Sequence, residues 1–351
     1  METKQVIGGE FEIDNINNLG SDLELQKEFS HGHFYSSGRA ALYHIINFSK
    51  QVGKSKILLP DYLCESIIEI VKLAAIPYKF YSVNQILSID LNSLIEIYDD
   101  NCSILVINYF GGIDIINEIK KIRSIDDKAY IILDNVQALF SMFETIDVDF
   151  MFTSFRKQLP VPDGAWVVTK HDGLFECDEK NTFAQYKLVG GLLKNFCKFN
   201  TVSDQIYLNF FENGESLINQ NLNAKISDIT LELLSKIDLN FIRLIRVNNS
   251  KYLIKGLQRL GYKTILHFKN NMVPLFVPIH LKNRDFFRQE LRKNNIYCPV
   301  HWPKSKEIQT DNNIFHQTEL SLVIDQRYDQ IDMNKILSVL ETIKNNENSY
   351  N

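Results

Sequence analysis

Apolar and polar positions follow two alternating patterns between residues 56 and 135. Short apolar runs rich in β-branched and aromatic residues predict buried strands at KILLP (56–60), IPYKFYSV (76–83), SILVINYF (103–110) and AYIILDN (129–135). Apolar residues spaced three or four apart predict amphipathic helices at DYLCESIIEIVKLA (61–74) and IDIINEIKKIRSI (113–125). This alternation predicts an α/β fold, with a three-layer α/β/α domain around a mostly parallel sheet.

The pattern changes in the last third of the chain. We expect a strand at 271–279 and helices at 283–296 and 331–343, which together favour a smaller α+β domain. The division predicted is a large domain at 1–235, including the N-terminal segment, and a small domain at 236–351. Residues 176–224 show the weakest periodicity, so we expect them to form a lid or dimer contacts.

Composition excludes several classes of protein. The chain has 351 residues, 45% of them hydrophobic, which is enough for a substantial core. Its net charge of −5 and scattered basic residues predict no nucleic-acid partner. No apolar run reaches the roughly 18 to 20 residues of a membrane helix, and the first residues are polar, so we expect a cytoplasmic protein. The five widely spaced cysteines predict reduced thiols and no metal site.

Ligands of such sheets bind beyond the carboxyl ends of the strands, and three stretches with suitable chemistry fall there. In FYSSGRAALYHII (34–46), Ser37 and Gly38 precede a helical pattern that starts near Arg39. Free backbone N–H groups at such a helix start can hold an anion such as phosphate. The alternative interpretation is an ordinary helix cap.

In IILDNVQAL (131–139), Asp134 ends a strand and Gln137 follows three residues later. A carboxylate there can pair with a protonated ring nitrogen, although Asp also caps helices. In FTSFRKQLPVPDGA (152–165), Ser154 and Lys157 follow an apolar run. A hydroxyl that binds phosphate beside an amine that forms a Schiff base suits a pyridoxal-phosphate (PLP) enzyme, whereas the alternative is a solvated lysine.

The order of the three stretches strengthens each of them. An anion loop, a strand-end Asp about a hundred residues later and a Lys 23 residues beyond it follow the order of parts in fold-type I PLP enzymes. From about residue 6 to about residue 342, the chain resembles the DegT/StrS-type nucleotide-sugar aminotransferases. The resemblance rests on SSGRAAL, LLPDYLCESI, NYFGGID, LDNVQAL, FTSFRKQLPVPDGA, NAKISDI, CPVHWP and LSLVIDQRY, in that order.

The resemblance implies a role for each matching residue. Lys157 would bond the cofactor, and Asp134 would keep its ring nitrogen protonated while Gln137 lies near the ring hydroxyl. Ser154 would bind the cofactor phosphate together with the residues of the first helix start, Ser37, Gly38 and Arg39.

The resemblance also implies a homodimer, because in that family an asparagine from the partner subunit reaches the phosphate. Asn223 of NAKISDI occupies the matching position, although it would also suit an exposed helix N-cap. His301 and Trp302 of CPVHWP match a segment at the mouth of the active site, which makes them candidates for substrate binding; structural packing is the alternative.

The sequence departs from the family at several places, among them Ala165, where the family has a glycine, and Arg39, where it has a threonine. Lys157 directly follows Arg156, whereas the family places two residues between a histidine and the lysine. Leu63 and Cys64 replace a pair that includes the aromatic residue expected to stack on the cofactor ring, so Tyr62 and Cys64 are candidates for that contact.

The activity implied is a PLP-dependent aminotransferase. The amino donor would be an amino acid such as glutamate, and the acceptor a nucleotide-linked keto-deoxysugar for surface polysaccharide. Two alternatives stay open. The chain could be a PLP enzyme with another reaction type or a non-sugar substrate, or an inactive homologue that binds a sugar nucleotide or a partner protein.

Overall fold

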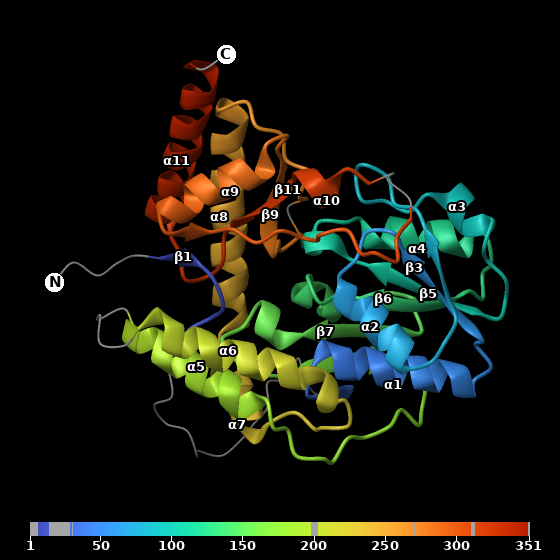
Figure 1. Cartoon of the computed structure of the whole chain (residues 1–351). Coiled ribbons are helices and arrows are strands. Elements are labelled where there is room, and N and C mark those ends of the chain that lie inside the picture. Colours follow the sequence, from blue (N-terminus) through green and yellow to red (C-terminus); the bar gives the residue numbers. More distant parts are fainter. Residues whose placement is uncertain are drawn as a thin grey trace.

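A seven-stranded sheet forms the centre of the larger part of the molecule (Figure 1). The computed structural model describes residues 6–13, 29, 31–197, 203–269, 271–309 and 313–349, with side chains as far as 346. The strand order is β2-β8-β7-β6-β5-β3-β4. The bounds are β2 (His33–Tyr35), β3 (Lys56–Pro60), β4 (Tyr78–Tyr81), β5 (Cys102–Ile107), β6 (Tyr130–Asp134), β7 (Phe150–Ser154) and β8 (Ala165–Thr169).

Strands β3 to β7 pair in parallel, and β8 and β2 add an antiparallel edge. Every residue of β5, β6 and β7 is buried, as expected for strands covered on both faces. The first helices are α1 (Gly38–Gln51), α2 (Glu65–Leu73), α3 (Leu91–Ile95) and α4 (Ile115–Arg123). The predicted fold class, a mostly parallel α/β/α sheet, is therefore confirmed.

Residues 176–224 are helical over much of the part that the structure describes, and the expectation of a lid or dimer contacts there stays a prediction. Two helices, α5 (Ala184–Cys197) and α6 (Asp204–Leu217), pack against each other, and α7 (Asp228–Lys236) follows (Figure 1). Glycines allow the close approach, since a Cβ on Gly190 would lie 2.8 Å from the Phe211 ring and one on Gly214 would lie 3.0 Å from the Lys187 side chain. At this contact glycine backbone and the aliphatic part of the Lys187 side chain replace large apolar side chains. The spacing of apolar residues that predicts a helix is therefore weak in this stretch.

A second buried cluster lies in the C-terminal third. It contains residues of α8 (Leu239–Arg259), β9 (Phe276–His280), α9 (Arg284–Lys293), β10 (Ile296–Tyr297), β11 (Glu319–Val323) and α11 (Gln330–Ser349). The short helix α10 (Phe315–Thr318) precedes β11, and its Phe315 packs in the first cluster. The N-terminal strand β1 (Ile7–Gly8) pairs in parallel with β10, which brings the start of the chain to this cluster. Helix α8 joins the two parts, because Leu239 packs in the first cluster and Leu253 in the second. The predicted boundary between residues 235 and 236 stays a prediction.

None of the helices in the described ranges is both long enough and apolar enough to cross a lipid bilayer.

Candidate active site

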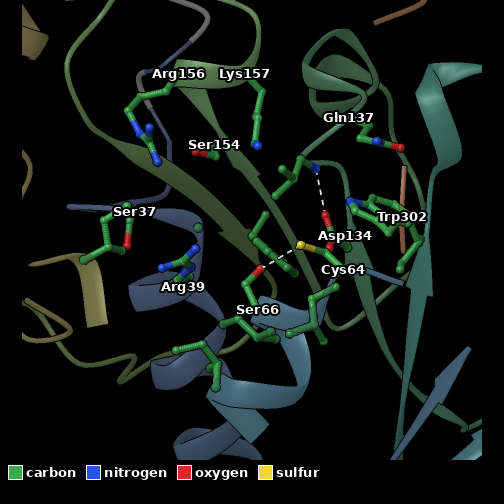
Figure 2. A pocket seen from close by; sticks show the side chains of 18 of the residues that line it. Ser37, Arg39, Cys64, Ser66, Asp134, Gln137, Ser154, Arg156, Lys157 and Trp302 are labelled. Carbon is green, nitrogen blue, oxygen red and sulfur yellow. Dashed lines mark hydrogen bonds between the residues drawn. The ribbon is translucent and has the colours of Figure 1, made fainter. Parts of the chain in front are cut away.

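A cavity of about 240 Å³ lies at the carboxyl ends of β5, β6 and β7 (Figure 2). We call it the ring cavity. It brings together ten of the twelve residues that the sequence singled out: Ser37, Gly38, Arg39, Cys64, Asp134, Gln137, Ser154, Lys157, His301 and Trp302. Tyr62 and Asn223 do not line it.

Lys157 is positioned by a single 3₁₀ turn, Phe155–Lys157, that directly follows β7. Phe155 fixes this turn, because its side chain is buried and its N–H donates to the carbonyl of Gly164 at 3.0 Å. Figure 2 shows the Lys157 amine extending into the space bordered by Ser154 and Asp134. The amine and the strand-end carboxylate therefore share one cavity, which is what a ring held between them requires.

Asp134 is the last residue of β6, and its side chain is only 5% exposed. Burial raises its pKa to about 7, although the N–H of Val136, which donates to Oδ1 at 2.8 Å, and the charge of Lys157 both act to lower it. Its Oδ2 has no protein partner in the described ranges of the chain. A cationic N–H in the cavity would meet that oxygen and restore the charged form of Asp134.

Gln137 has one half of its amide already used. Its Oε1 accepts from the N–H of Phe110 at 2.9 Å, which fixes the orientation of the side chain. The NH₂ group is then the half that remains for the ring cavity, and it can donate to an oxygen there.

The N-terminus of α1 meets the end of β7 in a tight contact. Ser37 caps the helix, its Oγ accepting from the N–H of Ala40 at 3.1 Å. A Cβ on Gly38 would lie 3.3 Å from the Cβ of Ser154, so only glycine leaves the space between them open. Two serine hydroxyls and the first N–H groups of a helix converge there, which fits a phosphate group.

The PDGA segment connects three loops of the site. Asp163 is buried and accepts from the N–H and the hydroxyl of Ser227, at 2.8 and 2.5 Å. Gly164 has φ +100°, and a Cβ there would lie 2.8 Å from Ile226. Its N–H donates to the carbonyl of Ser36 at 2.7 Å. The Lys157 turn, the loop before α1 and the NAKISDI segment are therefore tied together.

A charged cluster that the sequence did not predict lies beside Lys157. Glu215 of α6 pairs with Arg39 at 2.8 Å, Lys187 at 3.1 Å and Arg156 at 3.5 Å, and Lys187 also contacts Glu10 at 3.0 Å. Burial would raise the pKa of Glu215, but the three cations lower it to about 2. These residues come from five segments of the chain, and the sequence offers no signal that joins them. The side chain of Arg39 is therefore already held by protein partners.

His301 and Trp302 both line the ring cavity, and His301 is fixed by hydrogen bonds. The Nδ1 of His301 lies 2.8 Å from the Oγ of Ser321, and its backbone N–H donates to Glu319 at 2.7 Å. Burial and the charge of Lys157 lower the pKa of His301 to about 3, so the imidazole is neutral. Trp302 packs against Tyr62, with ring centroids 5.4 Å apart.

The structure corrects the expectation for Tyr62. Its ring is fully buried among Tyr109, Trp302, Phe315 and His316, behind the cavity wall, and its hydroxyl donates to the carbonyl of His301. Tyr62 supports the wall instead of facing a ring. Cys64 does line the cavity, as the cap residue of α2, and the aromatic residues Trp302 and Phe152 line it too.

Asn223 lies on an exposed turn next to the loop before α1, where the N–H of Ser36 donates to the carbonyl of Ala224 at 3.2 Å. The helix cap of α7 is Ser227, so the alternative interpretation of Asn223 as a helix N-cap is wrong.

Comparison with known proteins bears on the fold of the chain. No protein-family model matches the sequence, and no curated protein matches it. Solved structures do match over the whole fold. A DegT/DnrJ/EryC1/StrS aminotransferase from Brucella abortus is 15% identical, with a TM-score of 0.64 over 89% of this chain and 86% of that one. The putative sugar aminotransferase Spr1654 from Streptococcus pneumoniae, in its PMP form, is 13% identical, with a TM-score of 0.63 over 90% and 88%.

DesV from S. venezuelae is 14% identical, with a TM-score of 0.62 over 92% of this chain and 91% of that one. Identities this low establish the shape of the chain and not its activity. The resemblance found in the sequence is confirmed at that level: this chain has the fold of the DegT/StrS-type aminotransferases, a fold-type I α/β architecture.

Proposed function

We propose that this chain is a PLP-dependent aminotransferase. The observation that carries the proposal is the ring cavity, where Lys157, Asp134 and the contact between α1 and Ser154 border one space. The Lys157 amine can bond an aldehyde, and the Asp134 carboxylate can pair with a protonated ring nitrogen. The contact between α1 and Ser154 can hold a phosphate. The structural neighbours support the same conclusion, because Spr1654 is described in both a PMP form and a PLP form.

Each residue contributes a separate physical effect. When bound, PLP supplies an aldehyde that condenses with amines and a ring that accepts electrons. The α1 N-terminus and Ser154 bind the phosphate, Asp134 holds the proton of the ring nitrogen, and the Gln137 amide orients the ring by donating to its oxygen. The Lys157 Nζ lies where it can take the proton from the amino-bearing carbon of a donor.

For the substrates we propose chemical classes and no single compound. We infer a cytoplasmic enzyme with an amino-acid donor such as glutamate. Its acceptor would be a nucleotide-linked keto-deoxysugar on a route to surface polysaccharide. This rests on the sequence resemblance and on the fold shared with proteins described as sugar aminotransferases.

We also propose a homodimer with a shared active site. Asn223 is exposed, does not line the ring cavity and lies on a turn bonded to the loop that precedes α1. Mixing two inactive proteins, Lys157→Ala and Asn223→Ala, should restore activity, because a mixed dimer assembles one intact site. No recovery after subunit exchange would contradict a shared site.

A half-reaction tests the proposed activity. The purified protein is incubated with PLP and glutamate, and both 2-oxoglutarate release and conversion of PLP to PMP are followed. We expect the two to rise together and to require Lys157. A lysine-bound PLP spectrum without keto-acid release would indicate another PLP reaction. No such spectrum, with no effect of Lys157→Ala, would indicate an inactive binding protein.

A further inference from the structure

A second cavity, of about 370 Å³, begins at Lys157 and extends away from the ring cavity. We call it the arginine cavity. The two cavities share Arg156, Lys157, Leu275 and His301. Otherwise their walls differ, because Asp134 and Trp302 line only the first, whereas the N-terminal segment, α9 and the chain after β10 line only the second. A substrate whose reacting carbon lies at Lys157 can therefore extend into the arginine cavity.

The lining of this cavity has a large excess of positive charge. Six cationic residues face it and only two carboxylates, Glu10 and Asp325. Both carboxylates are already paired within the protein: Glu10 with Lys187 at 3.0 Å and Asp325 with Arg327 at 2.8 Å. The lining cations are Arg156, Lys157, Arg246, Arg288, Arg292 and Arg327.

Two of the arginines are structural. Arg246 is fully buried and donates to the side chain of Gln326 at 3.0 Å and to the carbonyl of Leu275 at 3.1 Å. Arg327 is bonded to Asp325 and Glu12, both at 2.8 Å. Their guanidinium groups are committed to the protein, so they set the local potential and need no ligand.

Three other arginines keep donors for a ligand. Arg156 has a buried Nε without a partner in the described part of the chain, and its carboxylate contacts are long, at 3.5 and 3.9 Å. Arg288 uses its Nε on the carbonyl of Cys298 at 3.2 Å, and neither it nor Arg292 has an ion pair among the described residues. Arg292 lies over the ring of Tyr297, 5.9 Å from its centre.

Glu319, the carboxyl group on which Arg288 acts, does not neutralise the two arginines of α9. Arg288 acts on Glu319, but burial dominates there and raises the pKa of that carboxyl to about 8, so it is mostly protonated at pH 7. Arg288 and Arg292 are four residues apart on α9 (Arg284–Lys293), so their side chains are neighbours on one face of the helix. Their positive charge is thus concentrated at one wall of the cavity.

We propose that the arginine cavity binds the diphosphate of a nucleotide-linked substrate through Arg288, Arg292 and Arg156. The argument rests on the function proposed above, since it takes Lys157 as the reacting end. Guanidinium groups bind phosphate oxygens with paired N–H donors. Two arginines lie one helical turn apart on α9, and a third lines the same cavity from the turn after β7. Three such cations suit the charge of two phosphate groups better than that of a single carboxylate. The exposed ring of Tyr297 lies beside Arg292, where the nucleoside would follow.

Calorimetric titration of the full-length, PLP-saturated protein with pyrophosphate tests the proposal. The double variant Arg288→Ala/Arg292→Ala should weaken pyrophosphate binding by about tenfold or more. Lys293→Ala is the matched control: it removes a cation from the same helix, but that side chain is 60% exposed, pairs with Glu290 and does not line the cavity. The thermal midpoints of the wild type and the variants establish that each is folded. If the double variant is unfolded, pyrophosphate binding is measured on the two single variants instead.

Several results would overturn the assignment. Unchanged pyrophosphate affinity in the arginine variants would do so, and so would an equal loss in Lys293→Ala. Tighter binding of glutarate than of pyrophosphate, lost in the same variants, would assign the cavity to a dicarboxylate donor instead. The titration is repeated without PLP. If the PLP and glutamate reaction fails while arginine-dependent pyrophosphate binding persists, the proposed function falls and the binding site stands.

Discussion

The two cavities that meet at Lys157 differ in the charge of the residues that line them. The ring cavity holds a buried carboxylate, Asp134, whose pKa burial raises to about 7, against apolar walls and a helix N-terminus. The arginine cavity is larger and is lined by six cations against two carboxylates. One is suited to a flat ring with a cationic nitrogen, and the other to an extended anion. If the proposed function holds, cofactor and substrate bind on separate sides of Lys157.

Removing that lysine should have the largest effect, because both cavities end at it. We expect Lys157→Ala to lower turnover by about 1,000-fold or more, the range for loss of an acid–base group. Lys157→Arg should be equally inactive, since it keeps the charge but cannot bond the aldehyde. The measurements are turnover and the spectrum of bound PLP. Substantial activity in either variant would contradict the role of Lys157.

Asp134→Asn should affect the ring cavity alone. If Asp134 raises the pKa of the ring nitrogen by two units, its loss costs about 2.7 kcal/mol, or about 100-fold in turnover. Pyrophosphate binding in the arginine cavity should not change. A drop in both turnover and pyrophosphate affinity would show that the two cavities do not act independently.

The same variant has a predicted pH signature in the protein without PLP. The folded-state pKa of Asp134 is raised from 3.8 to about 7, so the folded protein binds more protons than the unfolded one in that window, and stability falls as pH rises through it. Asp134→Asn should remove this decline, and its thermal midpoint at pH 8 should exceed that of the wild type. Asp172→Asn, at an exposed position, is the control and should leave the pH profile intact.

Ser154→Ala should weaken cofactor binding through the phosphate. Loss of a hydrogen bond to a charged group costs about 1.5 to 3 kcal/mol, or roughly 10- to 100-fold in the dissociation constant of PLP. Pyridoxal, which lacks the phosphate, supplies the internal control: its affinity should be the same for both proteins. An equal loss for PLP and pyridoxal would place the effect outside the phosphate contact.

Trp302→Leu should have a smaller effect than the changes at Lys157, Asp134 and Ser154. Trp302 lines the ring cavity and not the arginine cavity, so we expect a loss of about 1 kcal/mol in PLP affinity, a factor of about five. Trp302→Phe should recover part of it. A larger change in substrate affinity than in PLP affinity would return Trp302 to the substrate role that the sequence suggested.

Much of the fold could be predicted because its signals are local. The runs KILLP and AYIILDN and the helical spacing after residue 113 gave β3, β6 and α4 within a few residues. The α5–α6 pair was missed because Gly190 and Gly214 replace apolar side chains at its contact. Tyr62 was predicted to face the cavity, but only Cys64, two residues later, lines it, while Tyr62 is buried behind the wall. The sequence does not show in which direction a side chain points.

The sequence by itself determined the order of the site's parts: a helix start, a strand-end carboxylate and a strand-end lysine. Parallel strands end at one edge of the sheet, so this order is enough to place them together. Only the tertiary structure decided what surrounds them. The N-terminal strand pairs with β10, and α6 and α9 approach Lys157 from positions far apart in the chain. Charges gathered in this way leave no pattern along the sequence, because their spacing is set by packing between distant segments.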